Sequence, residues 1–338
     1  MPQTPEQTPS RMADAHKKWY AFKRTMPGKK NLKRKTLGKG AVTWINVENP
    51  TQESLARLKK RYPFLLDIDL QDCLPPFQRP KLLARTTYLF MVLLFPVYDQ
   101  KRRAVHQYEV DFFIGKNFLI TSHAGTHSAI AELVGECEDD SGHCMLRSTT
   151  DPLRLAHDVV HGLTVSCFPM ITMISNDLLS LEGKLFHNTS GELVREILRV
   201  RSNILTFRKT MQGHDATIER LLTRGEKLFS VEALRSEYDD IRAHGREMRD
   251  FLNNDKDTVD ALYDSHLSLI SHHTGEEIKT LTALAFIIFP MTLVAAIFAM
   301  RAEHMPFVGM PNDFWIMIGI IFGTMVALVL LLKAKKWL

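Results

Sequence analysis

The 338-residue sequence has little that would suit a secreted protein or an enzyme. Its four cysteines, Cys73, Cys137, Cys144 and Cys167, lack the spacing of a disulfide framework, and no secretory signal is recognised before them. We therefore expect reduced thiols in a cytosolic setting. The sequence also lacks a nucleophile–base set, and the Gly-Lys-Gly at 38–40 is too short for a phosphate-binding loop. No enzymatic activity is expected.

Candidate zinc ligands are also sparse. Cys137 and Cys144 flank His143, but their spacing is not that of a zinc knuckle, and a polar surface loop is the favoured interpretation. His157 and His161 stand four residues apart, a spacing that places two zinc ligands on one helix face. Histidines of this kind more often belong to a polar helix face, so both interpretations of this pair stay open.

The net charge of +5 is concentrated near the N-terminus. Residues 11–39 hold eleven Lys or Arg residues and one acid, Asp14, after a start rich in Pro, Thr and Gln. This composition predicts a disordered basic leader over residues 1–41. Contact with anionic lipid or with nucleic acid is the alternative use of such a segment. Nothing else in the sequence supports nucleic acid, so we expect no nucleic-acid partner.

Two long uncharged apolar runs occupy the C-terminal end, at 281–300 and 314–332. Twenty helical residues span about 30 Å, the thickness of the hydrocarbon core of a bilayer, so both runs are predicted transmembrane helices. The loop at 301–313 joins them into a hairpin. The basic tail at 333–338 favours the cytoplasmic side, which also places the large N-terminal region there. The sequence thus predicts a two-pass protein of the plasma (inner) membrane, with both termini cytoplasmic and the loop outside.

The first predicted span is the better candidate to line a pore. It carries Pro290 in its middle, with Thr282 and Thr292 near it, and several alanines that permit close helix contacts. Neighbouring helices or threonine hydroxyls can satisfy the backbone group that Pro290 leaves free. The second span is smoother and richer in Leu, Val and Ile, which suits contact with lipid.

The soluble part divides into an α/β domain at 42–148 and a helical and stalk region at 149–280. The expected elements of the first are strands at 42–47, 88–98, 108–115 and 117–122 and a helix at 51–62. The expected helices of the second are 151–187, interrupted by Pro169, then 192–222, 234–253, and a last one from near Asp255 that runs into the first span. That last helix would be about 68 Å long, and its rough apolar seam needs partners, most simply symmetry copies.

Residues 42–338 resemble the CorA family of divalent-cation transporters. The resemblance is carried by four motifs in order: Gln78-Arg79-Pro80-Lys81, Pro290-x-Thr292, Glu303-His304-Met305-Pro306, and Lys335-Lys336-Trp337-Leu338. It implies a CorA-like fold: an α/β cytoplasmic domain, long stalk helices and a transmembrane hairpin, assembled as a homopentameric funnel in lipid. It also implies Mg²⁺, Co²⁺, Ni²⁺ or Zn²⁺ as transported or regulatory ion, and no organic cofactor.

The sequence departs from the family where the first span ends. The family has Gly-Met-Asn there, whose asparagines meet hydrated Mg²⁺, whereas this chain has Ala299-Met300-Arg301. A guanidinium offers five donors and no acceptor, so Arg301 would repel a dication unless it pairs outward with Glu303 or Asp313. A near-copy of the lost motif, Gly-Met-Pro-Asn, lies at 309–312. The filter expected from the resemblance comprises Ala299, Met300, Arg301, Glu303 and Thr292.

The resemblance assigns two further sets of positions. Gly275, Ile278 and Leu281 fall on the pore and its hydrophobic gate, although ordinary stalk packing is the alternative for the last two. Phe289 is bulkier than a pore-facing residue should be. Asp72, Asp240 and Asp264 match cytoplasmic acids that bind regulatory metal between subunits, with solvated surface charge as the alternative for each.

Three hypotheses remain open at this point. The chain is a divalent-cation transporter with an altered filter; or a relative that does not conduct Mg²⁺ and acts as a membrane sensor, a scaffold or a channel for another solute; or a membrane-tethered protein that binds through its basic leader.

Overall fold

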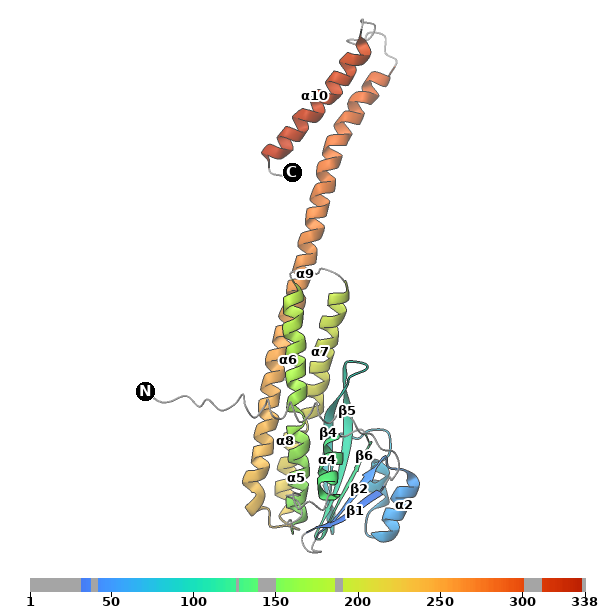
Figure 1. The fold of residues 1–338 in the computed structure, drawn as a ribbon, viewed down its shortest axis with the longest axis vertical. Coiled ribbons are helices and arrows are strands. Elements are labelled where there is room, and N and C mark those ends of the chain that lie inside the picture. Colours follow the sequence, from blue (N-terminus) through green and yellow to red (C-terminus); the bar gives the residue numbers. More distant parts are fainter. Residues whose placement is uncertain are drawn as a thin grey trace, which may run out of the picture. The chain divides into compact units, whose positions relative to one another are not determined.

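A six-stranded sheet forms the centre of the first of two compact units in the computed structural model (Figure 1). The structure describes residues 32–37, 42–125, 128–138, 150–185, 191–300 and 312–335. The first unit ends at Leu262 and the second begins at Tyr263, so helix α9 (Arg235–Ala299) belongs to both.

The sheet is mixed, with strand order β1-β2-β6-β5-β4-β3. Only β2 and β6 are parallel among these neighbours, and every other pair is antiparallel. The long central pair forms because both strands are rich in aromatic and branched residues, which pack well on a pleated surface. The strands are β1 (Leu32–Leu37), β2 (Val42–Glu48), β3 (Lys81–Ala84), β4 (Tyr88–Asp99), β5 (Ala104–Gly115) and β6 (Phe118–His123).

Helices cover both faces of the sheet. On one face, α2 (Gln52–Arg61) inserts Leu55 and Leu58 into an apolar cluster with Ile45, Phe90 and Phe113, and α3 (Asp67–Asp72) adds Leu70. On the other face lie α5 (Pro152–Val165), α7 (Gly191–Met211) and α8 (His214–Gly225). The remaining helices of this unit are α4 (Ser128–Glu138), α6 (Phe168–Leu185), the short 3-10 turn η4 (Glu232–Leu234) and the first part of α9.

The α/β prediction and the continuous stalk are confirmed, but three element boundaries were wrong. The helix expected over 192–222 is two helices, because the chain turns at Gly213, where Pro80 leaves no room for a side chain. The helices expected at 234–253 and from 255 are one, α9, because nothing between them breaks the backbone hydrogen bonding. Residues 32–37, placed in the leader, form edge strand β1 against β2; basic residues are tolerated on a sheet edge. Residues 1–31 lie outside the described part.

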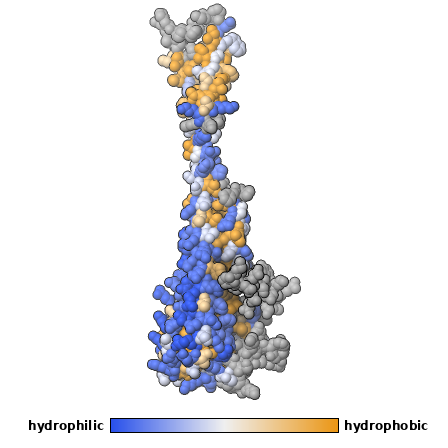
Figure 2. All heavy atoms as spheres, turned by 90° about the vertical axis from the view of Figure 1, so that its left-hand side faces the viewer, coloured by the Kyte–Doolittle hydropathy of each residue, from blue (hydrophilic) through white to orange (hydrophobic). Residues whose placement is uncertain are grey.

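The second unit is a helical hairpin made of the rest of α9 and α10 (Asp313–Ala334) (Figure 1). Among the residues that the structure describes, three helical stretches are long and apolar enough to cross a membrane, one of them the α5–α6 segment Pro152–Leu185. That segment is 50% buried within the protein, whereas the apolar windows of α9 and α10 are 6% buried. The apolar surface of this hairpin is visible in Figure 2, and the two helices agree with the two predicted spans.

Candidate functional site

The pore positions expected from the sequence lie on one side of α9, within its membrane part and just before it. Gly275, Ile278, Leu281, Phe289 and Thr292 are all exposed. At 3.6 residues per turn these five positions fall within about 120° of one another around the helix. Side chains of Ile278 and Leu281 are 58% and 67% exposed, which is costly for large apolar groups outside a bilayer or a partner.

The opposite side of α9 is the one that is covered. Ala283 is buried, and Ile287 and Pro290 are half-buried. Leu332 on α10 is also buried, and α10 runs back beside α9 in Figure 1. Within this unit, therefore, the expected pore face and the packed face of α9 point in different directions.

Pro290 lies within α9 without ending it. Its missing N–H leaves the carbonyl of Phe286, four residues earlier, without its usual helical donor. Thr292 Oγ1 donates to the carbonyl of Phe289 at 2.8 Å instead, and Thr282 Oγ1 donates to that of Ile278 at 2.8 Å. The two threonine hydroxyls thus bond to carbonyls of neighbouring turns and do not replace the lost bond.

The expected filter is only partly within the described residues. Helix α9 ends at Ala299, and the backbone N–H of Met300 still donates to the carbonyl of Ile297 at 3.2 Å. Met300 is exposed. Arg301, Glu303 and the Gly-Met-Pro-Asn sequence up to Pro311 lie outside the described residues.

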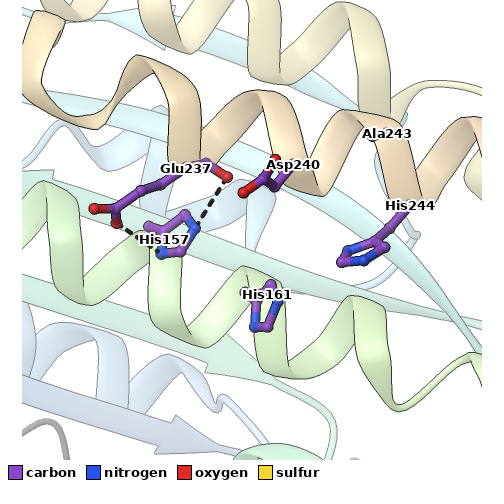
Figure 3. Close-up of a pocket in the computed structure, with 6 residues that line it drawn as sticks. All are labelled: His157, His161, Glu237, Asp240, Ala243 and His244. Carbon is purple, nitrogen blue, oxygen red and sulfur yellow. Dashed lines mark hydrogen bonds and ion pairs between the residues drawn. The ribbon is translucent and has the colours of Figure 1, made fainter. Parts of the chain in front are cut away.

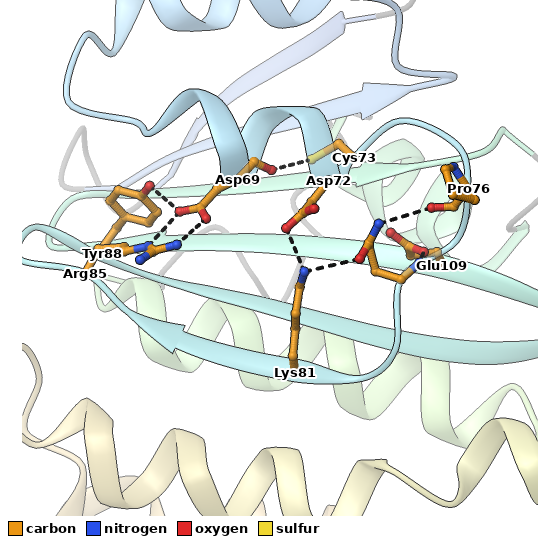
Figure 4. A network of polar contacts seen from close by, with 9 residues as sticks. Asp69, Asp72, Cys73, Pro76, Lys81, Arg85, Tyr88 and Glu109 are labelled. Atoms are coloured by element: carbon orange, nitrogen blue, oxygen red, sulfur yellow. Dashed lines mark hydrogen bonds and ion pairs between the residues drawn. The ribbon is translucent and has the colours of Figure 1, made fainter.

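Asp72, the first of the three expected regulatory acids, is engaged within its own chain (Figure 4). Lys81 Nζ lies 2.6 Å from Asp72 Oδ2, and both side chains are about three-quarters buried or more, at 27% and 20% exposure. Lys81 also reaches Gln78, whose backbone N–H donates to Glu109. Burial raises the pKa of Glu109, and Lys81 opposes that shift. Lys81 thus neutralises a carboxylate that a regulatory cation would need.

Asp69 lies beside this network and is more deeply buried. Its carboxylate accepts hydrogen bonds from Arg85 at 2.9 and 2.5 Å and from the Tyr88 hydroxyl at 2.6 Å (Figure 4). The Asp69 side chain is completely buried. This arrangement is a structural anchor that ties α3 to β4, and it leaves Asp72 at the helix end facing Lys81.

The other two acids lie on α9 in different surroundings. Asp264 is exposed. Asp240 lines a pocket of about 250 Å³ between α5 and α9 in the first unit, together with His157, His161, Glu237, Ala243 and His244 (Figure 3). Sequence inspection had paired His157 with His161 only. His244 and Glu237 were missed. The four-residue spacing of Asp240 and His244 could have shown that these two side chains lie on the same face of a helix.

His157 is held on both sides of its ring. Nδ1 lies 3.0 Å from Asp158 Oδ1, and Nε2 lies 3.2 Å from the backbone carbonyl of Glu237. The ring stacks on His161 with centroids 5.7 Å apart, and the ring centroids of His161 and His244 are 5.8 Å apart. In the described residues, no three His, Cys, Asp or Glu side chains are placed so that they hold a metal ion as they stand.

Comparisons with known proteins agree with this fold. A family model described as "CorA-like Mg2+ transporter protein" matches residues 39–335. The chain is 24% identical over 302 residues to the cobalt/magnesium transport protein CorA of Thermotoga maritima, covering 88% of this chain and 83% of that one. It is 23% identical over 294 residues to a putative metal ion transporter, YfjQ, of Bacillus subtilis, covering 87% and 89%.

Solved structures show the same fold. The complete CorA magnesium transporter from Methanocaldococcus jannaschii superposes with a TM-score of 0.79 at 18% identity, over 90% of this chain and 94% of that one. The full-length CmaX protein gives a TM-score of 0.69 at 15% identity, over 88% and 89%.

A large α/β domain, one continuous stalk helix and a C-terminal apolar hairpin define a membrane protein of the transporter class rather than an enzyme. The chain belongs to the CorA family of metal ion transporters.

Proposed function

We propose that this chain conducts divalent cations through a pore formed by α9 of five copies, with an outer entrance altered by Arg301. The observation that carries the proposal is that Gly275, Ile278, Leu281 and Thr292 are all exposed and lie on one side of α9, a side different from the one on which Ala283 is buried. Symmetry copies would cover that face and create an axial path. Membership of the CorA family supports metal ions as the class of transported substrate.

The altered entrance is supported by electrostatics. At about 8 Å and an effective dielectric near 40, one Arg–Mg²⁺ pair costs roughly 2 kcal/mol before screening, and a ring of five multiplies that cost. Conduction therefore requires that the Arg301 side chains turn outward and pair with an acid of the loop, Glu303 or Asp313. Where Asp313 is that partner, Glu303 stays free to supply the oxygen ligands that a hydrated divalent ion prefers.

The second candidate function is a CorA relative that does not conduct Mg²⁺ and serves as a sensor, a scaffold or a channel for another solute. Two features favour it. Arg301 replaces the expected acceptor, and a ring of arginines suits an anion. Phe289, at 71% exposure, places a bulky ring on the face that would line the pore.

Uptake into proteoliposomes separates the two candidates. The full chain is compared with Arg301→Asn and with the charge-preserving control Arg301→Lys, each with Mg²⁺, Co²⁺, Ni²⁺ and Zn²⁺ outside. The proposal expects uptake of at least one of these ions by the unmodified chain, and faster uptake by Arg301→Asn than by Arg301→Lys. Uptake by Arg301→Asn alone would mean a pore that is built but closed by charge, which favours the second candidate. No uptake by any of the three would remove the transporter proposal.

The same proposal includes regulation by divalent cations that bind the cytoplasmic acids, but at a weakened site. Asp72, Asp240 and Asp264 are offered as regulatory ligands between neighbouring copies. Asp72 brings its own counter-ion, Lys81, and Gln71 stands beside it. A regulatory cation must displace that lysine. We therefore expect the pore to close at a higher cytosolic Mg²⁺ concentration than it would if the carboxylates had no counter-ion of their own.

Topology and partners complete the proposal. The basic tail and the large N-terminal region lie in the cytoplasm, the 301–313 loop lies outside, and the other partners are lipid and four further copies of the chain. A membrane-tethered binding role through residues 1–41 is the weakest alternative. Deleting residues 1–31 would leave uptake nearly unchanged if the pore is the functional site.

A further inference from the structure

A second pocket of the first unit lies where the bend between β4 and β5 meets α7. Its volume is about 580 Å³, within the range of pockets that hold small organic ligands. The wall combines cations, aromatic rings and a histidine from three separate parts of the chain. These residues are Phe77 before β3, Arg102, His106 and Tyr108 of the bend and of β5, and Lys209 of α7.

Buried and paired side chains hold the walls of this pocket in place. Asn203 on α7 is buried; its Oδ1 accepts from the backbone N–H of Val105 at 3.0 Å, and its Nδ2 donates to the carbonyl of Arg103 at 3.0 Å. The Arg103 guanidinium also lies 3.5 Å from Asp177 on α6 and 3.5 Å from Glu196 on α7. The bend is therefore fixed on these two helices, and the pocket between them is preformed.

The two cations of the pocket wall are not neutralised as Arg103 is. Among the residues that the structure describes, Lys209 forms no ion pair, and Arg102 approaches one acid, Asp99, at 3.9 Å. The backbone N–H groups of Arg102 and Lys101 both donate to Asp99 and lower its pKa, so this carboxylate stays ionised and is already engaged. Two cations against one carboxylate leave the wall positive, which favours an anionic ligand.

A buried nitrogen on the same wall has no partner. The Nε2 atom of His106 makes no hydrogen bond within the described part of the chain. Buried polar atoms nearly always have a partner, so this nitrogen indicates that a ligand completes it. With its hydrogen on Nε2, His106 donates to an oxygen of an anion, as Arg102 and Lys209 do. Such charged and neutral N–H donors are the groups that bind phosphate.

Aromatic rings form the remaining part of the wall. Phe77 is an exposed ring at the pocket, and Tyr108 lines the same space. A nucleobase would cover the face of Phe77 by stacking on it, a contact that every base can make because each has a flat ring. Phosphate alone would leave that ring in water. A ligand that carries a phosphate group and a flat ring therefore uses both parts of the wall.

We propose that this pocket binds one nucleoside phosphate per chain. Arg102, Lys209 and His106 hold the phosphate oxygens, and Phe77 stacks on the base. The inference goes beyond the proposed function and does not rest on it, since binding at equilibrium needs neither a pore nor the movement of ions.

Binding to the full-length protein in detergent tests the proposal. ATP and GTP are titrated by calorimetry in a buffer that contains EDTA, so that divalent cations take no part. Adenosine and tripolyphosphate, which each supply one half of ATP, are titrated in the same way. We expect one nucleotide per chain, and binding of each half about tenfold weaker than that of ATP, because each half engages only part of the wall. No binding of either nucleotide, or tripolyphosphate binding as tight as that of ATP, would overturn the proposal.

Three variants change exposed side chains of the wall: Arg102→Gln, Lys209→Gln and Phe77→Ala. The matched control is Lys101→Gln, which removes a charge from an exposed residue of the same bend that does not line the pocket. We expect ATP to bind about tenfold more weakly to each wall variant and equally well to the control, whereas Phe77→Ala should leave the binding of tripolyphosphate unchanged. Equal ATP affinity for the wall variants and the control would contradict the assignment of this pocket.

Photocrosslinking of the unmodified protein does not depend on the folding of any variant. An azido derivative of ATP that reacts at its base should label the peptides that contain Phe77 or Tyr108, and excess ATP should prevent the labelling. Labelling confined to other peptides would place the nucleotide elsewhere and would overturn the proposal.

Discussion

The buried carboxylate of Asp69 is the most constrained charge in the α/β domain. Replacing it by Asn leaves Arg85 and Tyr88 facing an amide in place of an anion. Breaking one partner of a buried pair is costly, and because Arg85 is 28% exposed we expect the lower end of that range, about 3 kcal/mol. The measurement is chemical denaturation of Asp69→Asn followed by tryptophan fluorescence.

Asp67→Asn is the control for that substitution. Asp67 is 74% exposed and pairs with Lys59 at 3.2 Å, so its loss should change the free energy of unfolding by less than about 1 kcal/mol. Equal effects of the two substitutions would show that the Asp69 cluster does not anchor α3.

A second prediction for a single residue concerns the pH dependence that His214 gives to stability. Burial lowers its pKa to about 4, and its Nε2 donates to the carbonyl of Leu94 at 2.5 Å. The neutral form is therefore the folded form. Its contribution to stability is complete above pH 6.5, the ordinary pKa, and is lost as the pH falls from 6.5 toward 4, because the unfolded chain then binds the extra proton.

His214→Gln removes this titration while keeping a donor for Leu94. We expect the variant to lose less stability between pH 6.5 and pH 4 than the unmodified protein, measured as the difference in denaturation midpoint at the two pH values. His272→Gln, on an exposed histidine, should titrate like the unmodified protein. A variant with the same acid sensitivity as the unmodified chain would argue against a neutral buried His214.

Residue roles that depend on long-range contacts could not be predicted from the sequence. Asp72 was identified by its place in a motif, but its partner Lys81 is a neighbour only because β3 folds back beside α3. His157 and His161 were identified by spacing. His244 joins them because α5 and α9 pack side by side, which a pattern of four residues on one helix cannot reveal.

Among the elements, the turn between α7 and α8 depends on one close approach. A side chain at Gly213 would lie 2.6 and 2.7 Å from the Cβ and Cγ atoms of Pro80, whose ring cannot move aside easily. Gly213→Ala should therefore destabilise the protein by about 1–3 kcal/mol, the cost of overpacking. The prediction is checked by measuring the free energy of unfolding of the variant.

Gly245→Ala is the matched control, since this glycine lies within α9 and an added Cβ meets nothing within 4 Å. It should stabilise the helix by about 0.5–1 kcal/mol. We expect the two substitutions to change the free energy of unfolding in opposite directions. A change in the same direction for both would show that the Pro80 ring moves aside.

Element types were easier to predict than their ends. Runs such as Tyr88–Asp99 are rich in aromatic and branched residues, which favour a strand, so their type was clear. The α7–α8 turn carries a weak local signal, Gln212-Gly213, and is enforced by the distant Pro80. Conversely, α9 passes through Pro290 and Gly275, two residues that favour breaks, because the helix is long and propagation is cooperative.

At the scale of the whole molecule, the fold and the family explain why α9 leaves large apolar side chains exposed. The sequence could indicate the hairpin, because twenty uncharged residues have few other uses. It could not indicate which face of α9 would be free, since that depends on where α10 packs. Under the proposed function, the side of α9 that contains the exposed Ile278 and Leu281 would line an axis shared by several copies and would close the pore by excluding water.

Leu281→Asn tests that role in the assembled protein. A polar ring at this level keeps the constriction wet, so we expect uptake of Mg²⁺ or Co²⁺ into proteoliposomes to rise severalfold under conditions that close the unmodified protein. Leu330→Asn is the matched control: the same substitution at similar exposure, 61% against 67%, but on α10. Because α10 would not line the axis, its variant should behave like the unmodified protein. Increased uptake by both variants would indicate a general membrane defect, and increased uptake by neither would place the gate elsewhere on α9.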